Sequence, residues 1–396
     1  MTVPDTEGAL AGVRVVDLLD ERGIYGGKML ADLGADVIRV EPASGDPLRQ
    51  RGPLSATGDS LWYAYYASNR RFVTLDATTD GGRTALAALC GSADVVLDAG
   101  ALAAAGVDEG ALLRDHPALV LVSLSSFGRE GPWAEYLAPD LVAAALGGVA
   151  ATTGDTDTPP LRGFGEMTFA VPGGYVAIAA LAALRHARGT GEGQRVDLNV
   201  HETLVSCLEH VLMWLWYHER LPMALGPVLP RRGSLHWSDA YEVMNARDGA
   251  IMVTITPDPQ RLLAWLVEEG AQQDLLDERY LSPSFAGARP MTGRFMEVLE
   301  DWVATKEVAP FFFESQARHH PFGWVLPPDH LAANPHLSER DWWVEHPLPG
   351  GGGVRGPGAP YHFSETPWTA PGAPRPVAAE GDDDPAAVLR EIGWDA

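Results

Sequence analysis

The stretch GVRVVDLLDERGIYGGKMLADLGADVIRVEPASGDPLR, residues 12–49, decides the fold. It contains two runs rich in β-branched residues, Val13–Asp17 and Asp36–Val40, separated by a segment long enough for one helix. Short apolar runs of this kind, joined by a helical segment, are typical of a βαβ unit with parallel strands. The stretch therefore predicts the start of an α/β domain.

The same alternation continues along the chain. Strands followed by helices at this spacing predict a mostly parallel, Rossmann-like sheet. After residue 140 helices dominate, and one more strand is expected before the last of them. The further strands are expected at Val73–Leu75, Ala93–Leu97, Leu119–Ser123 and Arg195–Val200, and the helices at Gly82–Leu89, Glu109–Asp115, 141–150, 168–188 and 202–218.

A change of composition after Trp216 indicates a second domain. Residues 221–232 contain prolines and arginines and are typical of a linker. Ala240–Asn245 and Ala250–Ile255 then form a predicted β-hairpin, followed by amphipathic helices near 258–269 and 291–304 and a short terminal helix, Ala386–Ile392. We expect a large Rossmann-like domain whose N-terminal part is 1–224, a smaller α+β domain at 225–325, and a return to the large domain at 326–396.

Composition excludes several classes of protein. The chain has 53 Asp and Glu against 29 Lys and Arg, a net charge of −24, which disfavours nucleic acid and anionic membranes as partners. No signal-peptide pattern opens the sequence, and the apolar stretch Phe169–Leu184 is too short to span a membrane, so we expect a buried helix and a cytoplasmic protein.

The two cysteines, Cys90 and Cys207, are expected to be buried and unreactive. The histidines have no metal-site spacing, so no metal is predicted.

Five blocks occur in a recognisable order over about 330 residues. They are 12–49, ASNRRFVTLDATTDGGRTALAALCGSADVVLD (67–98), LVSLSSFGREGPW (121–133), ALRHARGTGEGQRVDLNVHETL (183–204) and PPDHLAANPHLSERDWW (327–343). In this order they resemble the family III CoA-transferases, the CaiB/BaiF family. The resemblance implies an interlocked homodimer of two-domain chains with CoA held at the domain junction. It implies acyl-CoA and carboxylic acid substrates and no permanently bound cofactor.

The resemblance also points to a nucleophile. Family transferases use an aspartate at the start of the long Ala-rich helix, and the only carboxylate in the matching stretch, residues 159–184, is Glu166. Counting back without gaps places the family aspartate near Phe169, so Glu166 fits only with a local shift. A glutamate can serve as a covalent nucleophile. The simpler alternative is an acidic residue in the first turn of a helix, where such residues are common.

A second enzymatic reading is that of the racemases of the same fold, which exchange an α-proton between two acid–base groups. Asp140 stands where their first pair would be, without its histidine, and Asp258 overlies the acid of their small domain. Glu166 with Asp140 or Asp258 would be the exchanging pair. The alternative for Asp140 is that it caps the helix that follows it.

The CoA-binding residues depart from the family pattern. The loop DAGALAAAGVD, 98–108, has no basic residue to meet a phosphate. Arg39, Arg70 and Arg71 are the candidate nucleotide contacts, and otherwise would be surface arginines. The resemblance places Phe127 and Gly128 in a turn that lines the site.

The resemblance places the family's glycine-rich lid at RRGSLHWSDAY, 231–241, with His236 and Trp237 where its glycines would be. His236 is a candidate general base, or, with Trp237, a residue that shapes the substrate pocket. The altered CoA loop and the missing family aspartate leave a third reading open: a non-catalytic subunit that pairs with a paralogue in a heterodimeric transferase.

Overall fold

We describe a computed structural model of the chain over residues 8–155, 158–165, 167–217, 240–255, 257–277, 289–368 and 385–393. The chain divides into two compact units. The first unit comprises Met1–Val149, Arg162–Glu209 and Pro335–Ala396, and the second comprises Ala150–Leu161 and His210–Asn334. The small domain expected at 225–325 falls inside the last of these segments.

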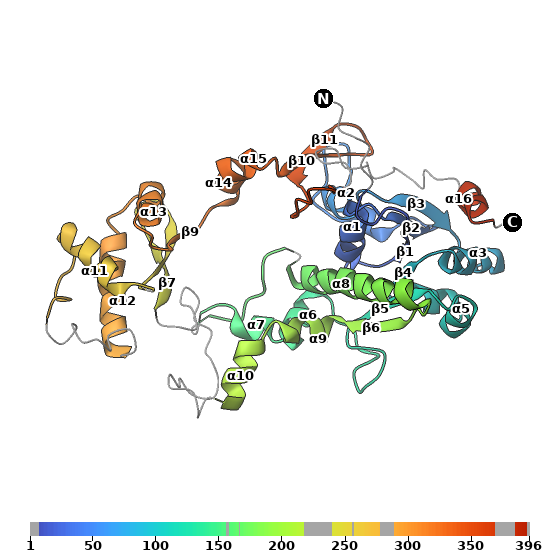
Figure 1. Cartoon of the computed structure of the whole chain (residues 1–396), viewed down its shortest axis with the longest axis horizontal. Helices are drawn as coiled ribbons and strands as arrows, with labels where there is room; N and C mark the ends of the chain where they lie inside the picture. Colours follow the sequence, from blue (N-terminus) through green and yellow to red (C-terminus); the bar gives the residue numbers. More distant parts are fainter. Residues whose placement is uncertain are drawn as a thin grey trace. The chain divides into compact units, whose positions relative to one another are not determined.

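The first unit is built on a sheet of six parallel strands within the described residues, in the order β3-β2-β1-β4-β5-β6 (Figure 1). The central strands are buried almost throughout, as expected when helices cover both faces of a parallel sheet. The predicted α/β class with a parallel sheet is confirmed. The strands are β1 (Arg14–Leu18), β2 (Asp36–Pro42), β3 (Arg71–Leu75), β4 (Val95–Asp98), β5 (Val120–Ser125) and β6 (Arg195–Asn199).

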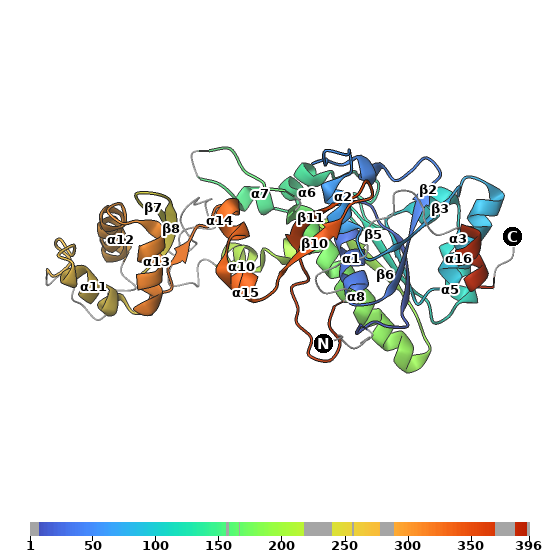
Figure 2. The same cartoon turned by 90° about the horizontal axis from the view of Figure 1, so that it is seen from above.

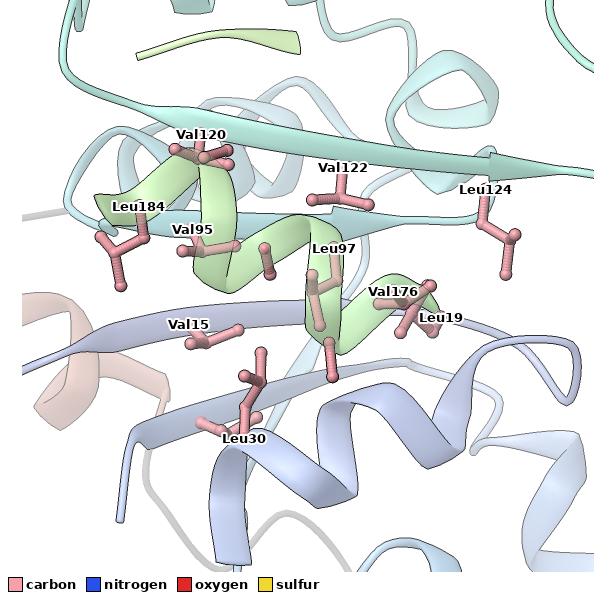
Figure 3. Close-up of a cluster of buried hydrophobic side chains, with 14 of the residues drawn as sticks. Val15, Leu19, Leu30, Val95, Leu97, Val120, Val122, Leu124, Val176 and Leu184 are labelled. Carbon is pink, nitrogen blue, oxygen red and sulfur yellow. The ribbon is translucent and has the colours of Figure 1, made fainter. Parts of the chain in front are cut away.

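Alternate side chains of the strands enter two separate cores. Val15 faces α1 (Ile24–Asp32) and α8 (Met167–Thr190), and Figure 3 shows it near Leu30 of α1, with Val176 of α8 further along beside Leu19. The next residue, Val16, belongs to the core on the opposite face, because successive side chains of a strand point in opposite directions. That second core is covered by α3 (Asp80–Gly91), α5 (Glu109–Asp115) and α16 (Pro385–Glu391), which lie together in both views (Figures 1 and 2).

Helix α8 is the central helix of the first core. Among the described residues it is the one helix whose length and composition would let it cross a membrane, and half of its most apolar window is buried. It packs closely on α1 through glycines: a Cβ on Gly26 would lie 2.6 Å from the carbonyl oxygen of Gly173. Its buried residues pack against the sheet, which accounts for the apolar composition of that face.

The remaining elements of the first unit surround this core. The predicted helix 141–150 is divided in two at Gly147 and Gly148, and Gly148 has a left-handed φ of 80°. The predictions missed the antiparallel hairpin of β10 and β11, because the Pro- and Gly-rich C-terminal segment suggested loops. The elements are η1 (Pro47–Gln50), α2 (Leu61–Tyr66), α4 (Ala101–Ala105), α6 (Asp140–Leu146), α9 (Val200–Ser206), α15 (Pro335–Glu339), β10 (Trp343–Pro347) and β11 (Gly353–Pro357). The short helix α7 (Val149–Thr152) begins at the last residue of the segment Met1–Val149 and continues into the second unit.

The second unit contains a three-stranded antiparallel sheet covered by helices. The predicted hairpin is confirmed, with Tyr241 paired to Thr254 and Asn245 to Ala250. Helix α13 was not predicted. The elements are α10 (Glu209–Tyr217), β7 (Tyr241–Asn245), β8 (Ala250–Thr254), α11 (Pro259–Glu268), α12 (Arg289–Val303), α13 (Val308–Ala317), β9 (Gly323–Trp324) and α14 (Pro328–Ala332).

The two cysteines differ in environment. Cys90 is buried in α3, and burial raises the pKa of its thiol to about 12, so it behaves as a small apolar side chain. Cys207 is exposed. The prediction of burial is therefore confirmed for Cys90 and wrong for Cys207, whose apolar neighbours in sequence do not cover it.

Candidate active site

The order of the strands in the sheet predicts where a ligand would bind. From β1 the strands run outward through β2 to β3, and in the other direction through β4 and β5 to β6. The order therefore reverses between β1 and β4, and open α/β sheets bind ligands beyond the carboxyl ends of the strands at such a switch point. The residues that follow these two strands, Leu19 and Asp20 after β1 and Ala99 after β4, all line one cavity of about 410 Å³.

This cavity, which we call the nucleotide cavity, is mainly apolar. One wall comes from α4, whose alanines face it where the sequence predicted a loop without basic residues. Its lining residues are Leu18, Leu19, Asp20, Arg39, Val40, Glu41, Pro42, Ala43, Asp46, Pro47, Leu48, Leu75, Asp76, Ala77, Thr78, Leu86, Ala99, Ala101, Ala104 and Ala105.

Arg39 and Arg70 are buried and share one carboxylate. The Arg70 Nε lies 2.9 Å from Asp17 Oδ2, and the Arg39 Nη1 lies 3.3 Å from the same oxygen. Arg39 also reaches Asp46 at 2.6 Å and lines the nucleotide cavity, whereas Arg70 lies behind it. The surface alternative is therefore wrong for both residues, because the Asp17 carboxylate draws them inward.

Asp46 stays ionised in this network. Burial alone would raise the pKa of its carboxyl, but the Arg39 guanidinium and the Leu48 N–H hold that pKa below its usual range.

Arg71 lies outside this network. It begins β3 at the opposite, amino edge of the sheet and pairs with Glu391 of α16 at 3.0 Å, so it lies outside the nucleotide cavity.

A second cavity, of about 340 Å³, lies over the ends of β4 and β5. Gly128 lines it with a left-handed φ of 94°, and its N–H donates to Ser125 Oγ at 2.8 Å. Phe127 packs against Trp133, at a ring separation of 5.5 Å. Arg22, which the sequence analysis overlooked, also lines this cavity and donates to Ser126 Oγ and to the Ala99 carbonyl oxygen.

Asp140 does not cap the helix that begins there. Helix α6 begins at Asp140 itself, Pro139 takes the cap position, and no side-chain capping hydrogen bond is made. The cap interpretation is therefore wrong. The carboxylate pairs instead with Arg162, whose Nη1 lies 2.5 Å from Oδ2, while the buried Oδ1 has no hydrogen-bond partner in the described chain.

Arg162 extends this contact toward the start of α8. The same Nη1 donates to the carbonyl oxygen of Gly165 at 3.0 Å. Gly165 immediately precedes Glu166, and α8 begins at Met167. Glu166 lies outside the described residues. Arg162 therefore ties Asp140 to the chain next to the predicted nucleophile, a link that the sequence analysis did not suggest.

The other predicted site residues fall in or near the second unit. His236 and Trp237 lie outside the described residues. Asp258 caps α11, with its Oδ1 accepting from the Arg261 N–H at 3.0 Å. Its carboxylate therefore stabilises the N-terminal end of α11.

A parallel sheet with a cavity at its switch point is the arrangement in which open α/β proteins bind ligands, and comparison with known proteins identifies the family. A model described as CoA-transferase family III matches residues 10–381. The chain belongs to this family.

Two relatives and one solved structure illustrate the similarity. The chain is 31% identical to succinyl-CoA:(R)-benzylsuccinate CoA-transferase subunit BbsE of Thauera aromatica, over 90% of this chain and 88% of that protein. It is also 31% identical to succinate–glutarate CoA-transferase of Agrobacterium fabrum, over 92% of each. The crystal structure of a CAIB/BAIF family protein from Brucella suis covers 98% of this chain and 100% of its own, with a TM-score of 0.81 and 26% identity.

The predicted family and enzyme class are confirmed: the protein is a CoA-transferase, which moves CoA between carboxylic acids. The relatives are named as transferases, so the racemase reading is not favoured.

Proposed function

We propose that this CoA-transferase works through a covalent intermediate on Glu166. The observation that carries the proposal is the contact of Arg162 with both Asp140 and the Gly165 carbonyl, which fixes the chain directly before Glu166. The N-terminal end of α8, a helix of 24 residues, follows at once. A carboxylate beside a helix N-terminus is stabilised in its ionised form, which is the nucleophilic form.

The chemistry proceeds in four steps. A carboxylate oxygen of Glu166 attacks the thioester carbon of the donor acyl-CoA, the C–S bond breaks, and CoA leaves as a thiolate. The thiolate attacks the glutamyl carbon of the resulting anhydride, which releases the donor acid and leaves a glutamyl-CoA thioester. The acceptor carboxylate attacks this thioester and expels the thiolate again. The thiolate then attacks the acceptor carbon of the new anhydride, which forms the product thioester and restores Glu166.

We place the nucleotide end of CoA in the nucleotide cavity, where Arg39 is the candidate contact. Arg70 acts through Asp17 by holding Arg39 in position. Phe127 and Gly128 would line the path toward the reacting thioester, while a role for Arg71, His236 or Trp237 stays a prediction. For the donor we propose succinyl-CoA, because the names of two relatives contain succinyl-CoA or succinate.

We further propose an interlocked homodimer in the cytoplasm. Large apolar side chains are exposed on the first unit, Leu141 of α6 and Ile178 of α8 at 61% each and Phe164 at 96%. Contiguous exposed apolar surface favours burial against another chain, and these three side chains are our candidates for it. Sedimentation at micromolar concentration should give a dimer, and a stable folded monomer would contradict the interlocked arrangement.

The test of the nucleophile is chemical trapping. Incubation with succinyl-CoA followed by hydroxylamine should leave a hydroxamate on Glu166, located by peptide mass spectrometry. Glu166→Gln should abolish both the adduct and the transfer, since an amide does not attack the thioester. The matched control is Glu192→Gln, in the exposed turn beyond the other end of α8, which should leave both unchanged.

One observation supports a second candidate. The relative from Thauera aromatica is named as a subunit, so this chain could pair with a paralogue that carries the nucleophile. In that case the isolated wild-type chain forms no adduct with succinyl-CoA, and Glu166→Gln has no effect on the activity of the reconstituted heterodimer.

A further inference from the structure

The nucleotide cavity carries an excess of negative charge. Four carboxylates line it, from Asp20, Glu41, Asp46 and Asp76, against one guanidinium, from Arg39. CoA has a 3′-phosphate on its ribose, and such a dianion binds where cations or free N–H groups face it. The charges of this cavity therefore oppose the phosphate.

The arginines that line the cavity or pair with its lining residues are already engaged by protein carboxylates. Arg39 is held by Asp17 and Asp46, at 3.3 and 2.6 Å. Arg22 reaches Asp20 at 2.5 Å. A phosphate would have to compete with these carboxylates, whose geometry is fixed by the fold.

Glu41 and Asp76 are the other two carboxylates that line the cavity. Arg49 reaches Glu41 at 2.9 Å. Asp76 accepts hydrogen bonds from the backbone N–H and the hydroxyl of Thr78, and no lysine or arginine pairs with it within the described chain. Asp76 thus adds a negative charge to the wall without a compensating cation.

The wall formed by α4 adds no charge. Its cavity-facing residues are Ala101, Ala104 and Ala105, and the whole segment 98–108 lacks lysine and arginine. The N-terminal end of this five-residue helix is taken by Asp98, whose carboxylate accepts from the N–H groups of Gly100 and Leu102. These backbone donors are therefore not available to an anion.

We propose that the nucleotide site binds CoA through its apolar walls and does not recognise the 3′-phosphate. This inference rests on the proposed placement of the CoA nucleotide in the nucleotide cavity. The substrate class of the enzyme then includes 3′-dephospho-CoA thioesters as well as CoA thioesters.

The experiment is a calorimetric titration of the purified wild-type protein with CoA and with 3′-dephospho-CoA. The two dissociation constants should agree within about threefold, because no charge-assisted contact is lost. One such contact is worth a factor of roughly ten or more. Tenfold tighter binding of CoA would overturn the inference, including the case in which a partner subunit supplies the cation. If neither compound binds, the placement of CoA fails, and the inference falls with it.

A variant with an added positive charge gives a second test, which does not depend on finding equal affinities for the two ligands. Ala104→Lys places an ammonium group on the α4 wall and should tighten CoA binding roughly tenfold relative to 3′-dephospho-CoA. Ala104→Met, of similar length and without charge, should show no preference. Circular dichroism confirms that both variants are folded. If Ala104→Lys affects both ligands equally, the phosphate does not lie at this wall and the proposal is wrong.

Discussion

The carboxylate of Asp140 and the guanidinium of Arg162 form an ion pair of 2.5 Å, although 22 residues separate them in the sequence. The pair joins the first turn of α6 to the segment that leads into α8. Because Arg162 also holds the Gly165 carbonyl, we expect its loss to affect the proposed nucleophile Glu166 more than the stability of the fold.

The first prediction concerns this pair. Arg162→Met should lower kcat by roughly a hundredfold, since displacements near 1 Å at a catalytic group have effects of this size. The melting temperature should change little, because the Arg162 side chain is 42% exposed and ion pairs in such positions contribute about 1 kcal/mol or less. Arg162→Lys, which keeps the charge, should recover part of kcat. A loss of melting temperature as large as the loss of activity would show a structural role instead.

A second prediction concerns the buried network around Asp17. Asp17→Asn leaves Arg39 and Arg70 without their shared negative charge, and breaking a buried pair in this way costs about 3–5 kcal/mol. Urea denaturation of the variant should show this loss. The control is Asp80→Asn at the exposed pair with Arg83, which should change the free energy of unfolding by about 0.5 kcal/mol or less. Equal effects of the two substitutions would contradict the network's structural role.

The third prediction is a pH dependence in the second unit. Glu269 accepts from the indole N–H groups of Trp265 and Trp302 and from Lys306. Burial alone would raise its pKa, but the hydrogen bonds from Lys306 and Trp302 outweigh burial and leave it below the ordinary 4.5. The folded state thus favours the ionised form. Its stabilisation is complete above the unfolded pKa and is lost as the pH falls through the folded pKa.

The measurement is the urea midpoint followed by tryptophan fluorescence. Glu269→Gln should lower the midpoint at pH 7, and the difference from wild type should shrink as the pH falls below about 4.5, the ordinary value of the carboxyl group. The control, Glu297→Gln on the exposed face of α12, should leave the midpoint of the second unit nearly unchanged. A difference between Glu269→Gln and wild type that stays constant from pH 7 to pH 3 would show that ionisation of Glu269 is not involved.

The parts of the fold that sequence could predict are those set by local pattern. The strands of the sheet and the hairpin of the second unit follow from short periodic runs bounded by turn residues. The hairpin of β10 and β11 has no such run, since prolines and glycines fill it, and its pairing appears only in the structure.

The site residues were harder to predict, because their roles depend on distant partners. Arg39 lies 22 residues from Asp17, and nothing in the local sequence shows that the two meet in the interior. The same separation hid the contact of Arg162 with Asp140. Composition did indicate the lack of cations in 98–108, because that property needs no partner.

The last prediction separates Glu166 from the position that gapless counting assigns to the nucleophile. Phe169 occupies that position and is 3% exposed, packed in the core between α8 and the sheet. Phe169→Asp should therefore place a carboxylate in an apolar core and destabilise the protein severely, by several kcal/mol, instead of supplying a nucleophile. Glu166→Asp should fold normally and keep a reduced rate of transfer, because the shorter side chain retains the carboxylate but not its reach.

The double variant Glu166→Gln, Phe169→Asp completes the test. It should be inactive and unstable, whereas Glu166→Asp should still form a hydroxamate after succinyl-CoA and hydroxylamine. Melting curves give the stability of each variant, and peptide mass spectrometry locates the adduct. An adduct on residue 169 of a folded double variant would show that the nucleophile belongs one turn further along α8, and Glu166 would then have only the role of a residue near the helix start.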